Sequence, residues 1–242
     1  MESEPRFDLD AMHAAVIAEQ SRDLASLAAH TLAPSAPFRF VPWESRAEAF
    51  GASELGALLD VSPYESRADL IYRKAHAIDV HRKPAMLLGQ CLEAGILAFY
   101  VALTHREAHP WGERKTIASD AFPRLVVTPD ASEPDAGTGP CLLEIKHSAG
   151  GKGWGTGRVI EEHEGFTVHE GAAAPLAIQV QTVAQLAVTG YPRARVVGLI
   201  RGKLRIYEIA RHEGVISRIR EECVSGWAEV AALRAASARH PY

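Results

Sequence analysis

Two charged side chains that could do chemistry together are Glu144 and Lys146, in the alternating apolar stretch 141–146. Alternation along a strand predicts that both lie on one face, with Cα atoms roughly 7 Å apart. An upstream apolar run, 125–127, and the turn-forming residues after it predict a second strand joined by a long turn, with Asp130 beside the pair. Carboxylates suit Mg²⁺, and a lysine can orient an attacking water. The pattern indicates a divalent-cation site; a solvated ion pair on the sheet is the alternative.

A third carboxylate, Glu93, lies inside an apolar segment that predicts a buried helix over residues 86–103. The apolar residues that recur there at helical spacing are Leu88, Leu92, Ile96, Phe99 and Leu103. A carboxylate on such a helix is costly unless it is paired or bound to a metal, so Glu93 is a further candidate ligand. The alternative is a glutamate at the edge of the apolar face, with its head in water.

A second helix is predicted over residues 175–192, because Pro175 suits a first helical turn and Gly190 suits a helix end. Gln181 and Gln185 are four residues apart in this helix and would share a face. A glutamine can contact a phosphate or the lysine without adding charge. Two solvated glutamines are the simpler interpretation.

Five motifs, in this order, resemble those of the PD-(D/E)XK nuclease superfamily, in particular its YqaJ-like viral recombinase or lambda exonuclease family. The motifs are GASELGALLDVSPYESRADLIYRKA at 51–75, GQCLE with Glu93, TPD with Asp130, LLEIK with Glu144 and Lys146, and Pro-x5-Gln ending at Gln181. The resemblance covers roughly residues 43–232. The chain departs from the family in having Ala131 after TPD, a lengthened turn before residue 141, and an insert between the last two motifs. These departures remove no catalytic residue but could change substrate access.

The resemblance implies a three-layer α/β fold with a restriction-endonuclease-like core, in which helices flank both faces of a mixed central sheet. It implies a Mg²⁺-dependent DNA exonuclease of phage-type recombination that hydrolyses phosphodiester bonds 5′ to 3′ from double-stranded ends, with Mn²⁺ expected to substitute. The implied partners are DNA ends, a single-strand annealing protein and further copies of the chain in a homotrimer. The alternatives are an endonuclease or opposite-polarity nuclease of the superfamily, or a non-catalytic DNA-end binding subunit.

The same resemblance assigns the metal ligands. Asp130 and Glu144 would bind the metal through their carboxylates, and Ile145 would add its backbone carbonyl. Glu93 would bind a second metal or its waters. All four positions lie within or beside the motifs quoted above.

Contacts to water and DNA are also implied by the resemblance. Lys146 would position the nucleophilic water, and Gln181 would support the lysine and the scissile phosphate. Ser53 is predicted to cap a short helix whose N-terminus is a ready anion site, and Arg46 lies seven residues before it. The resemblance implies that Arg46 and Ser53 bind the 5′-terminal phosphate. Without it, a simple N-cap and a surface ion pair would be favoured.

Composition sets the remaining limits. At 242 residues and 47% hydrophobic, we expect a nuclease domain over 43–242 after a helical extension and proline-rich linker over 1–42. A formal net charge of −4 means that DNA binding would need a local positive groove. Three scattered cysteines disfavour an iron–sulfur cluster and fit reduced thiols. No signal peptide or membrane span is visible, so we expect a cytoplasmic protein of a bacterial host, encoded by a phage or prophage.

Other segments are predicted as structural. They are an amphipathic helix at 8–33, a helix capped by Ser66, a hairpin around Gly202 and a closing helix at 213–236. The glycine-rich stretch 147–157 is not a Walker A loop. It predicts a mobile flap whose Lys152 and Arg158 reach phosphates while Trp154 offers a stacking surface; a disordered surface insert is the alternative.

Overall fold

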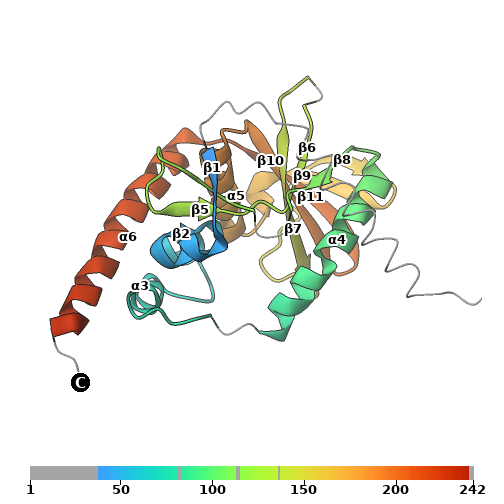
Figure 1. Ribbon diagram of the computed structural model, residues 1–242. Helices are drawn as coiled ribbons and strands as arrows, with labels where there is room; N and C mark the ends of the chain where they lie inside the picture. Colours follow the sequence, from blue (N-terminus) through green and yellow to red (C-terminus); the bar gives the residue numbers. More distant parts are fainter. Residues whose placement is uncertain (1–37, 81–82, 113–114, 136, 240–242) are drawn as a thin grey trace, which may run out of the picture. The chain divides into compact units, whose positions relative to one another are not determined.

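The computed structural model describes residues 38–80, 83–112, 115–135 and 137–239. The helix expected at 8–33 lies outside these residues, as does most of the extension expected over 1–42. The described chain holds two sheets, and helices cover both faces of the larger one (Figure 1). The expected mixed α/β fold is confirmed, with a small second sheet that the sequence did not predict.

The larger sheet has seven strands in the order β3-β6-β7-β10-β11-β9-β8. These strands are β3 (His109–Pro110), β6 (Ala131–Glu133), β7 (Cys141–Ser148), β8 (Val159–His163), β9 (Phe166–Glu170), β10 (Arg193–Ile200) and β11 (Lys203–Ala210). β7 runs parallel to β10 and β9 parallel to β11, while the other neighbours are antiparallel. β7 and β10 are central because they carry apolar side chains on both faces, and helices bury both.

The predicted hairpin around Gly202 is confirmed as the β10–β11 connection. Ile200 pairs with Lys203, so only two residues form the turn. Both have positive φ, 52° at Arg201 and 75° at Gly202. That combination matches the twist of the flanking strands and fixes their register.

The smaller sheet has the order β1-β4-β5-β2. Its strands are β1 (Phe38–Val41), β2 (Phe50–Gly51), β4 (Thr116–Ser119) and β5 (Leu125–Val127). The predicted hairpin between β5 and β7 is therefore wrong: β7 has β6 as its antiparallel neighbour, and β5 pairs with β4 and β2. Pro129 has no N–H to donate, so the first run ends and the chain crosses to the larger sheet before it pairs again.

β1 falls inside the segment expected to be a proline-rich linker. Its residues pair with β4 from Phe38 opposite Ser119 to Val41 opposite Thr116. Prolines flank this strand in the sequence and do not interrupt it, so no hydrogen bond of the ladder is lost.

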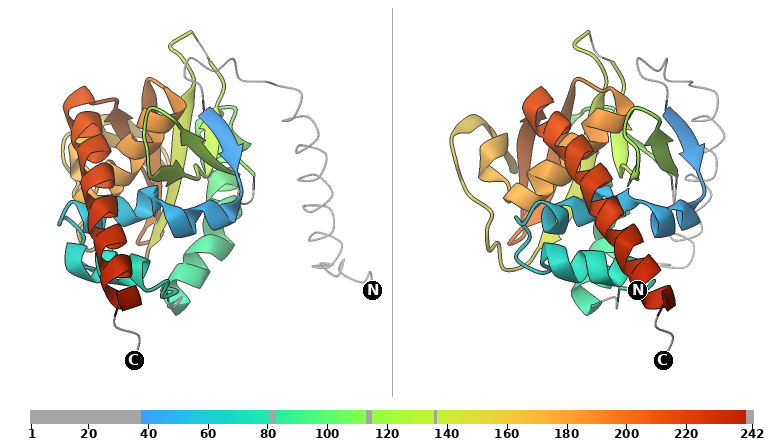
Figure 2. Two further views of the ribbon diagram at one scale, coloured as in Figure 1. Left: turned by 60° about the vertical axis from the view of Figure 1, so that its left-hand side comes forward. Right: turned by 90° about the vertical axis from the view of Figure 1, so that its left-hand side faces the viewer.

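Helices cover the two faces of the larger sheet. α5 (Leu176–Thr189) and α6 (Glu213–Arg239) lie on one side and α4 (Pro84–Thr104) on the other (Figures 1 and 2). Leu142 of β7 belongs to the core beneath α5 and Leu143 to the core beneath α4, as strand alternation requires. Shorter elements are η1 (Trp43–Glu48), η2 (Ala52–Glu54), α2 (Leu55–Leu58), α3 (Arg67–Ala75) and η3 (Gly171–Ala173). Ser66 caps α3 and α6 closes the fold, both as predicted.

α4 is not the buried helix that its sequence predicts. Its buried residues are Ile96, Leu97 and Tyr100, whereas Leu88 is 50% exposed and Phe99 is 42% exposed. Among the described residues, α4 is the helix with the length and apolar composition of a membrane span. The sequence shows how apolar the segment is but not how many of its faces are covered, and only one face of α4 packs against the sheet.

A buried polar network holds that face of α4 against the sheet. The Tyr100 hydroxyl and the Arg195 guanidinium both donate to Glu133, which ends β6. Arg195 Nε also donates to Glu208 Oε1 at 2.6 Å. Burial raises the pKa of Tyr100, so the hydroxyl keeps its proton and remains a donor. Because a buried, satisfied network has defined geometry, it sets how α4 lies on β6 and β10.

Candidate active site

β6 and β7 bring together the two carboxylates expected to bind metal. Ala131 pairs with Leu143, so Asp130, one residue before β6, stands opposite Glu144. The Asp130 Oδ2 atom accepts a hydrogen bond from the backbone N–H of Ile145 at 2.6 Å. This bond fixes the carboxylate at the point where the chain passes from the smaller to the larger sheet.

Glu144 is 1% exposed and is the centre of the polar contacts. Lys146 Nζ and Gln181 Nε2 both donate to its Oε1 atom. Gln185 Nε2 donates to its Oε2 atom at 2.6 Å. A buried carboxylate needs such donors, since burial without partners would cost several kcal/mol, on the order of 1–3 even for one missing hydrogen bond.

α5 supplies both glutamines from one face. Pro175 precedes the helix, and Gly190 ends it in the left-handed conformation with φ of 75°. Gln181 and Gln185 are therefore one turn apart, and each reaches a different oxygen of Glu144. The helix predicted at this place is confirmed.

Negative charge dominates this site. Burial raises the pKa of Asp130 well above its ordinary value, and the charge of Glu144 raises it further. Burial lowers the pKa of Lys146, but the charges of Glu144 and Asp130 outweigh it and raise that pKa to about 12. The lysine stays charged, yet one ammonium does not neutralise the neighbouring carboxylates. Such a site favours a cation.

Glu93 approaches the same charges from α4. It is half-buried and shares a helix face with Ile96 and Leu97, which are buried against the sheet. Burial raises the pKa of Glu93, while the Lys146 ammonium lowers it and Glu144 raises it. The Glu93 carboxylate is thus close enough for the charges of Lys146 and Glu144 to shift its pKa, but α4 lies on the opposite face of the sheet from α5.

The residues at this site fit a magnesium ion that takes some of its ligands from the protein and the rest from water and a substrate. In the part of the chain that the structure describes, no three His, Cys, Asp or Glu side chains are grouped as a ready-made metal cage. Asp130 and Glu144 offer two carboxylates, and the backbone carbonyl of Ile145 is a further oxygen. Mg²⁺ is commonly held by one or two carboxylates, waters and substrate phosphates. The residues present therefore fit an ion completed by nucleic acid.

Ser53 does not cap a helix, contrary to the prediction. It lies inside the turn η2, and the residue before that turn is Gly51. The Gly51 N–H donates to the Glu54 carboxylate at 2.8 Å, and α2 beyond it has only four residues. The short helix contributes little dipole, so an anion site here depends on side chains.

Arg46 and Ser53 do lie together, as expected. An Nη atom of Arg46 donates to Ser53 Oγ at 3.2 Å, and its guanidinium carbon lies 4.6 Å from the centre of the Trp43 ring. Gly51 makes the room for this arrangement, because an added Cβ would lie 2.3 Å from the Arg46 Nη. The guanidinium is thus stacked on one side and confined on another.

A charged platform holds the backbone that carries Arg46. Lys74 Nζ donates to the carbonyls of Arg46 and Ala49 at 2.8 and 2.9 Å, and it pairs with Glu54 at 2.8 Å. Arg73 pairs with the same carboxylate at 3.0 Å. Across the described residues, no carboxylate lies within ion-pair distance of Arg46, and burial lowers its pKa. The Glu54 charge still acts on Arg46, but no ion pair occupies its guanidinium, which suits an anionic ligand.

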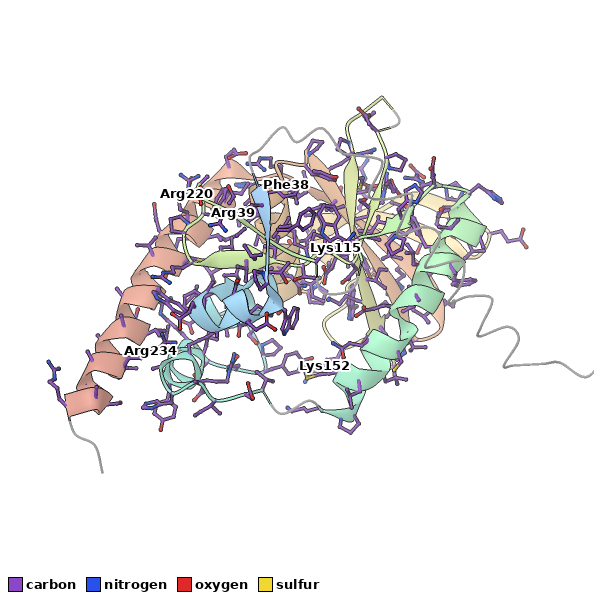
Figure 3. All side chains as sticks on the ribbon, in the orientation of Figure 1. Phe38, Arg39, Lys115, Lys152, Arg220 and Arg234 are labelled. Carbon is purple, nitrogen blue, oxygen red and sulfur yellow. The ribbon has the colours of Figure 1, made fainter. Side chains whose placement is uncertain are left out.

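The glycine-rich loop is anchored, which corrects the expectation of a free stacking residue. Trp154 packs on the core, with its ring centre 5.3 Å from that of Tyr207. The Tyr207 hydroxyl donates to the Gly155 carbonyl at 3.2 Å. Lys152 is exposed and remains a loop cation that could reach a phosphate (Figure 3). Arg158 faces Glu170 at 3.5 Å.

Gln185 is the residue that sequence reasoning left without a role. The helical spacing from Gln181 was the available signal, but spacing alone does not distinguish a solvated glutamine from a buried one. Gln185 is fully buried, and its partner is the carboxylate of Glu144.

Comparison with known proteins adds a family and a fold. Residues 43–192 match the YqaJ-like viral recombinase domain. The alkaline exonuclease LHK-Exo from Laribacter hongkongensis is 21% identical with a TM-score of 0.59, over 81% of this chain and 95% of that one. Its complex with dAMP is 19% identical with a TM-score of 0.59, over the same shares. No curated protein sequence matches the chain. At these identities the structural likeness supports the predicted restriction-endonuclease-like core.

Proposed function

Because the chain belongs to the YqaJ-like viral recombinase family and is by that membership a deoxyribonuclease, we propose that it is a Mg²⁺-dependent exonuclease that digests duplex DNA 5′ to 3′. The observation that carries the proposal is that Lys146 and Gln181 both donate to Glu144, while Asp130 stands opposite Glu144 on the neighbouring strand. Carboxylates, a charged lysine and an amide at one buried point can support metal-assisted phosphodiester hydrolysis.

Each residue has a distinct task in this proposal. Asp130, Glu144 and the Ile145 carbonyl hold Mg²⁺, and Glu93 holds a second ion or its waters. When bound, the ion supplies positive charge for the phosphate and makes a coordinated water more acidic. Lys146 keeps its proton, because its pKa is raised to about 12, so it orients the attacking water and stabilises negative charge without acting as the base.

Gln181 supports the lysine and the scissile phosphate. Its amide donates to the Glu144 oxygen that Lys146 also contacts. An amide donor at that position can turn to a phosphate oxygen without adding charge to the site.

The DNA end is held at Arg46 and Ser53. Among the described residues Arg46 forms no ion pair, although the Glu54 charge acts on it, and a guanidinium can bind two oxygens of a terminal phosphate. The solved complex of LHK-Exo holds dAMP, and we infer that this chain also binds mononucleotides and releases them as products.

The test of the metal site is Asp130→Asn and Glu144→Gln, each with Asp120→Asn as a matched control. Asp120 is exposed and pairs with Arg39 at 3.1 Å on the smaller sheet. Both site variants should lose well over tenfold in turnover on linear duplex in Mg²⁺ or Mn²⁺, on the order of what loss of metal support costs. Circular dichroism should report an intact fold. Retention of turnover by both would remove the assignment.

Two alternatives make different products from defined substrates. An endonuclease would cut a closed circular duplex, and an opposite-polarity exonuclease would release a label placed at the 3′ end first. A non-catalytic end-binding subunit would release nothing from either substrate. The proposal expects nucleotides from linear duplex only, with 5′-end label released first.

We extend the proposal to organisation and assembly. The nuclease domain spans 43–242 and takes in β1 from the extension over 1–42, because β1 pairs with β4. The protein works in the cytoplasm of a bacterial host with an annealing partner. Further copies of the chain form a homotrimer, and the exposed apolar residues of α4 support such a contact, because several large apolar side chains on one helix are left in water. These residues are Met86, Leu87, Leu88 and Phe99.

A further inference from the structure

Gln185 is buried deeper than any other donor to Glu144. Its exposed fraction is zero, while 28% of the Lys146 side chain is exposed. Its Nε2 atom lies 2.6 Å from Glu144 Oε2, an oxygen that Lys146 and Gln181 do not contact. Both oxygens of the carboxylate therefore accept hydrogen bonds, and among these three donors Gln185 alone donates to Oε2, the more deeply buried contact.

The other end of the Gln185 amide is left without a partner. Its Oε1 atom is buried and accepts no hydrogen bond from any described residue. The amide cannot be turned round to remedy this, because its oxygen would then face the Glu144 carboxylate. An unpaired buried acceptor costs free energy, and an apolar side chain of the same shape would avoid that cost. This cost offsets part of the stability that the Gln185 donor gives to the buried Glu144 carboxylate.

The three donors differ in what they can do when DNA and a cation arrive. Lys146 and Gln181 share the Oε1 atom and are partly exposed, so both can turn toward a water or a phosphate. Gln185 is enclosed within α5 and the core beneath it, so it has no second partner to turn to. Of the three donors, Gln185 is therefore the one placed to keep its hydrogen bond to Glu144.

We propose that Gln185 is a positioning residue that fixes the Glu144 carboxylate for cation binding through its hydrogen bond to Oε2. This inference rests on the proposed function, because it takes Glu144 as a metal ligand. Hydrogen-bonded partners of metal ligands commonly contribute 10- to 100-fold to metal affinity. Gln185 should therefore act on metal affinity, whereas Gln181 should act on turnover.

The test measures Mn²⁺ binding to the full-length protein by calorimetry, without DNA, together with turnover as a function of Mn²⁺. Gln185→Met removes the amide at nearly constant volume, and Gln185→Asn withdraws the donor by about one carbon–carbon bond, roughly 1.5 Å. The matched control is Thr182→Val, which removes another buried hydrogen bond of α5, Thr182 Oγ1 to the Ile178 carbonyl at 2.8 Å. Both Gln185 variants should bind Mn²⁺ about 10- to 100-fold more weakly and recover turnover at saturating Mn²⁺. The control should bind as the wild type does.

The outcomes separate the inference from the proposed function. Glu144→Gln serves as the reference: if it leaves Mn²⁺ binding unchanged, the metal site itself is wrong. If Glu144→Gln weakens binding but the folded Gln185 variants do not, only the inference fails. Should Gln185→Met not fold, Gln185→Asn decides, and failure of both to fold would mean that the residue is structural and overturn the positioning role.

Discussion

Substituting Gly51 by alanine should weaken recognition of the 5′-phosphate at a DNA end without removing any charged side chain. Gly51 has φ of −78° and ψ of 150°, which any residue adopts, so the backbone is not strained by the change. The added Cβ, however, would lie 2.3 Å from the Arg46 Nη and 2.7 Å from its guanidinium carbon. Ordinary contact begins at 3.4 Å, so the guanidinium must move by about 1 Å. Its 3.2 Å hydrogen bond to Ser53 does not survive that shift.

The size of the effect follows from what Arg46 is proposed to bind. A charge-assisted hydrogen bond to a phosphate contributes about 1.5–3 kcal/mol, which corresponds to roughly 10- to 150-fold in rate or affinity. Gly51→Ala leaves the positive charge nearby but misplaces its donors. We therefore expect at least the lower end, about tenfold, to be lost from the preference for phosphorylated ends.

The assay compares initial rates of digestion of 5′-phosphoryl and 5′-hydroxyl duplexes, and the ratio is the readout. Arg46→Ala gives the value expected when the guanidinium is absent. Arg39→Ala is the control, since Arg39 lies on β1, is 61% exposed and pairs with Asp120 (Figure 3). If Gly51→Ala keeps the wild-type ratio while Arg46→Ala loses it, the position of the Arg46 guanidinium between Gly51 and Ser53 is not the one that binds the phosphate. A wild type without preference would remove the end-binding assignment altogether.

Three further predictions concern the metal site and assembly. Lys146→Ala should lose turnover but keep Mg²⁺-dependent DNA binding, measured by fluorescence anisotropy, because lysine is not a ligand; joint loss of binding would contradict its role. Since the pKa of Asp130 is raised, protons compete with the cation, so calorimetric Mn²⁺ affinity should increase from about pH 5 to pH 8, and a flat profile would refute this. Leu88→Lys with Phe99→Glu should lower the molar mass seen by light scattering if α4 joins copies; an unchanged mass argues for another surface.

The periodicity of strands and helices correctly predicted which candidate site residues lie together, because it decides which side chains of one element share a face. The alternation of β7 put Glu144 and Lys146 together, and the helical spacing of α5 put Gln181 and Gln185 together. These are local relationships within one element. Asp130 reached the same place through β6, although its strand partner was predicted wrongly.

Relationships between elements were harder to predict from sequence. The apolar content of α4 predicted burial, but how much of a helix is covered depends on what packs against it, and the sheet covers one face only. Trp154 was expected to offer a stacking surface to DNA, whereas its ring packs against the ring of Tyr207, which is distant in the sequence. Ser53 was expected to cap a helix, but the Glu54 carboxylate already accepts from the Gly51 N–H at that turn.

The short parallel pairing of β2 with β5 has a consequence for the products of digestion. Gly51, beside the Arg46 guanidinium, pairs with Val126, and Asp130 follows Val126 by only four positions. Four residues span at most about 14 Å, and Pro129 stiffens the last step. On the proposed function, a DNA end held at Arg46 meets the cutting carboxylates at an offset fixed by protein backbone. The number of nucleotides between the held end and the scissile bond is then set by the enzyme and not by the DNA sequence.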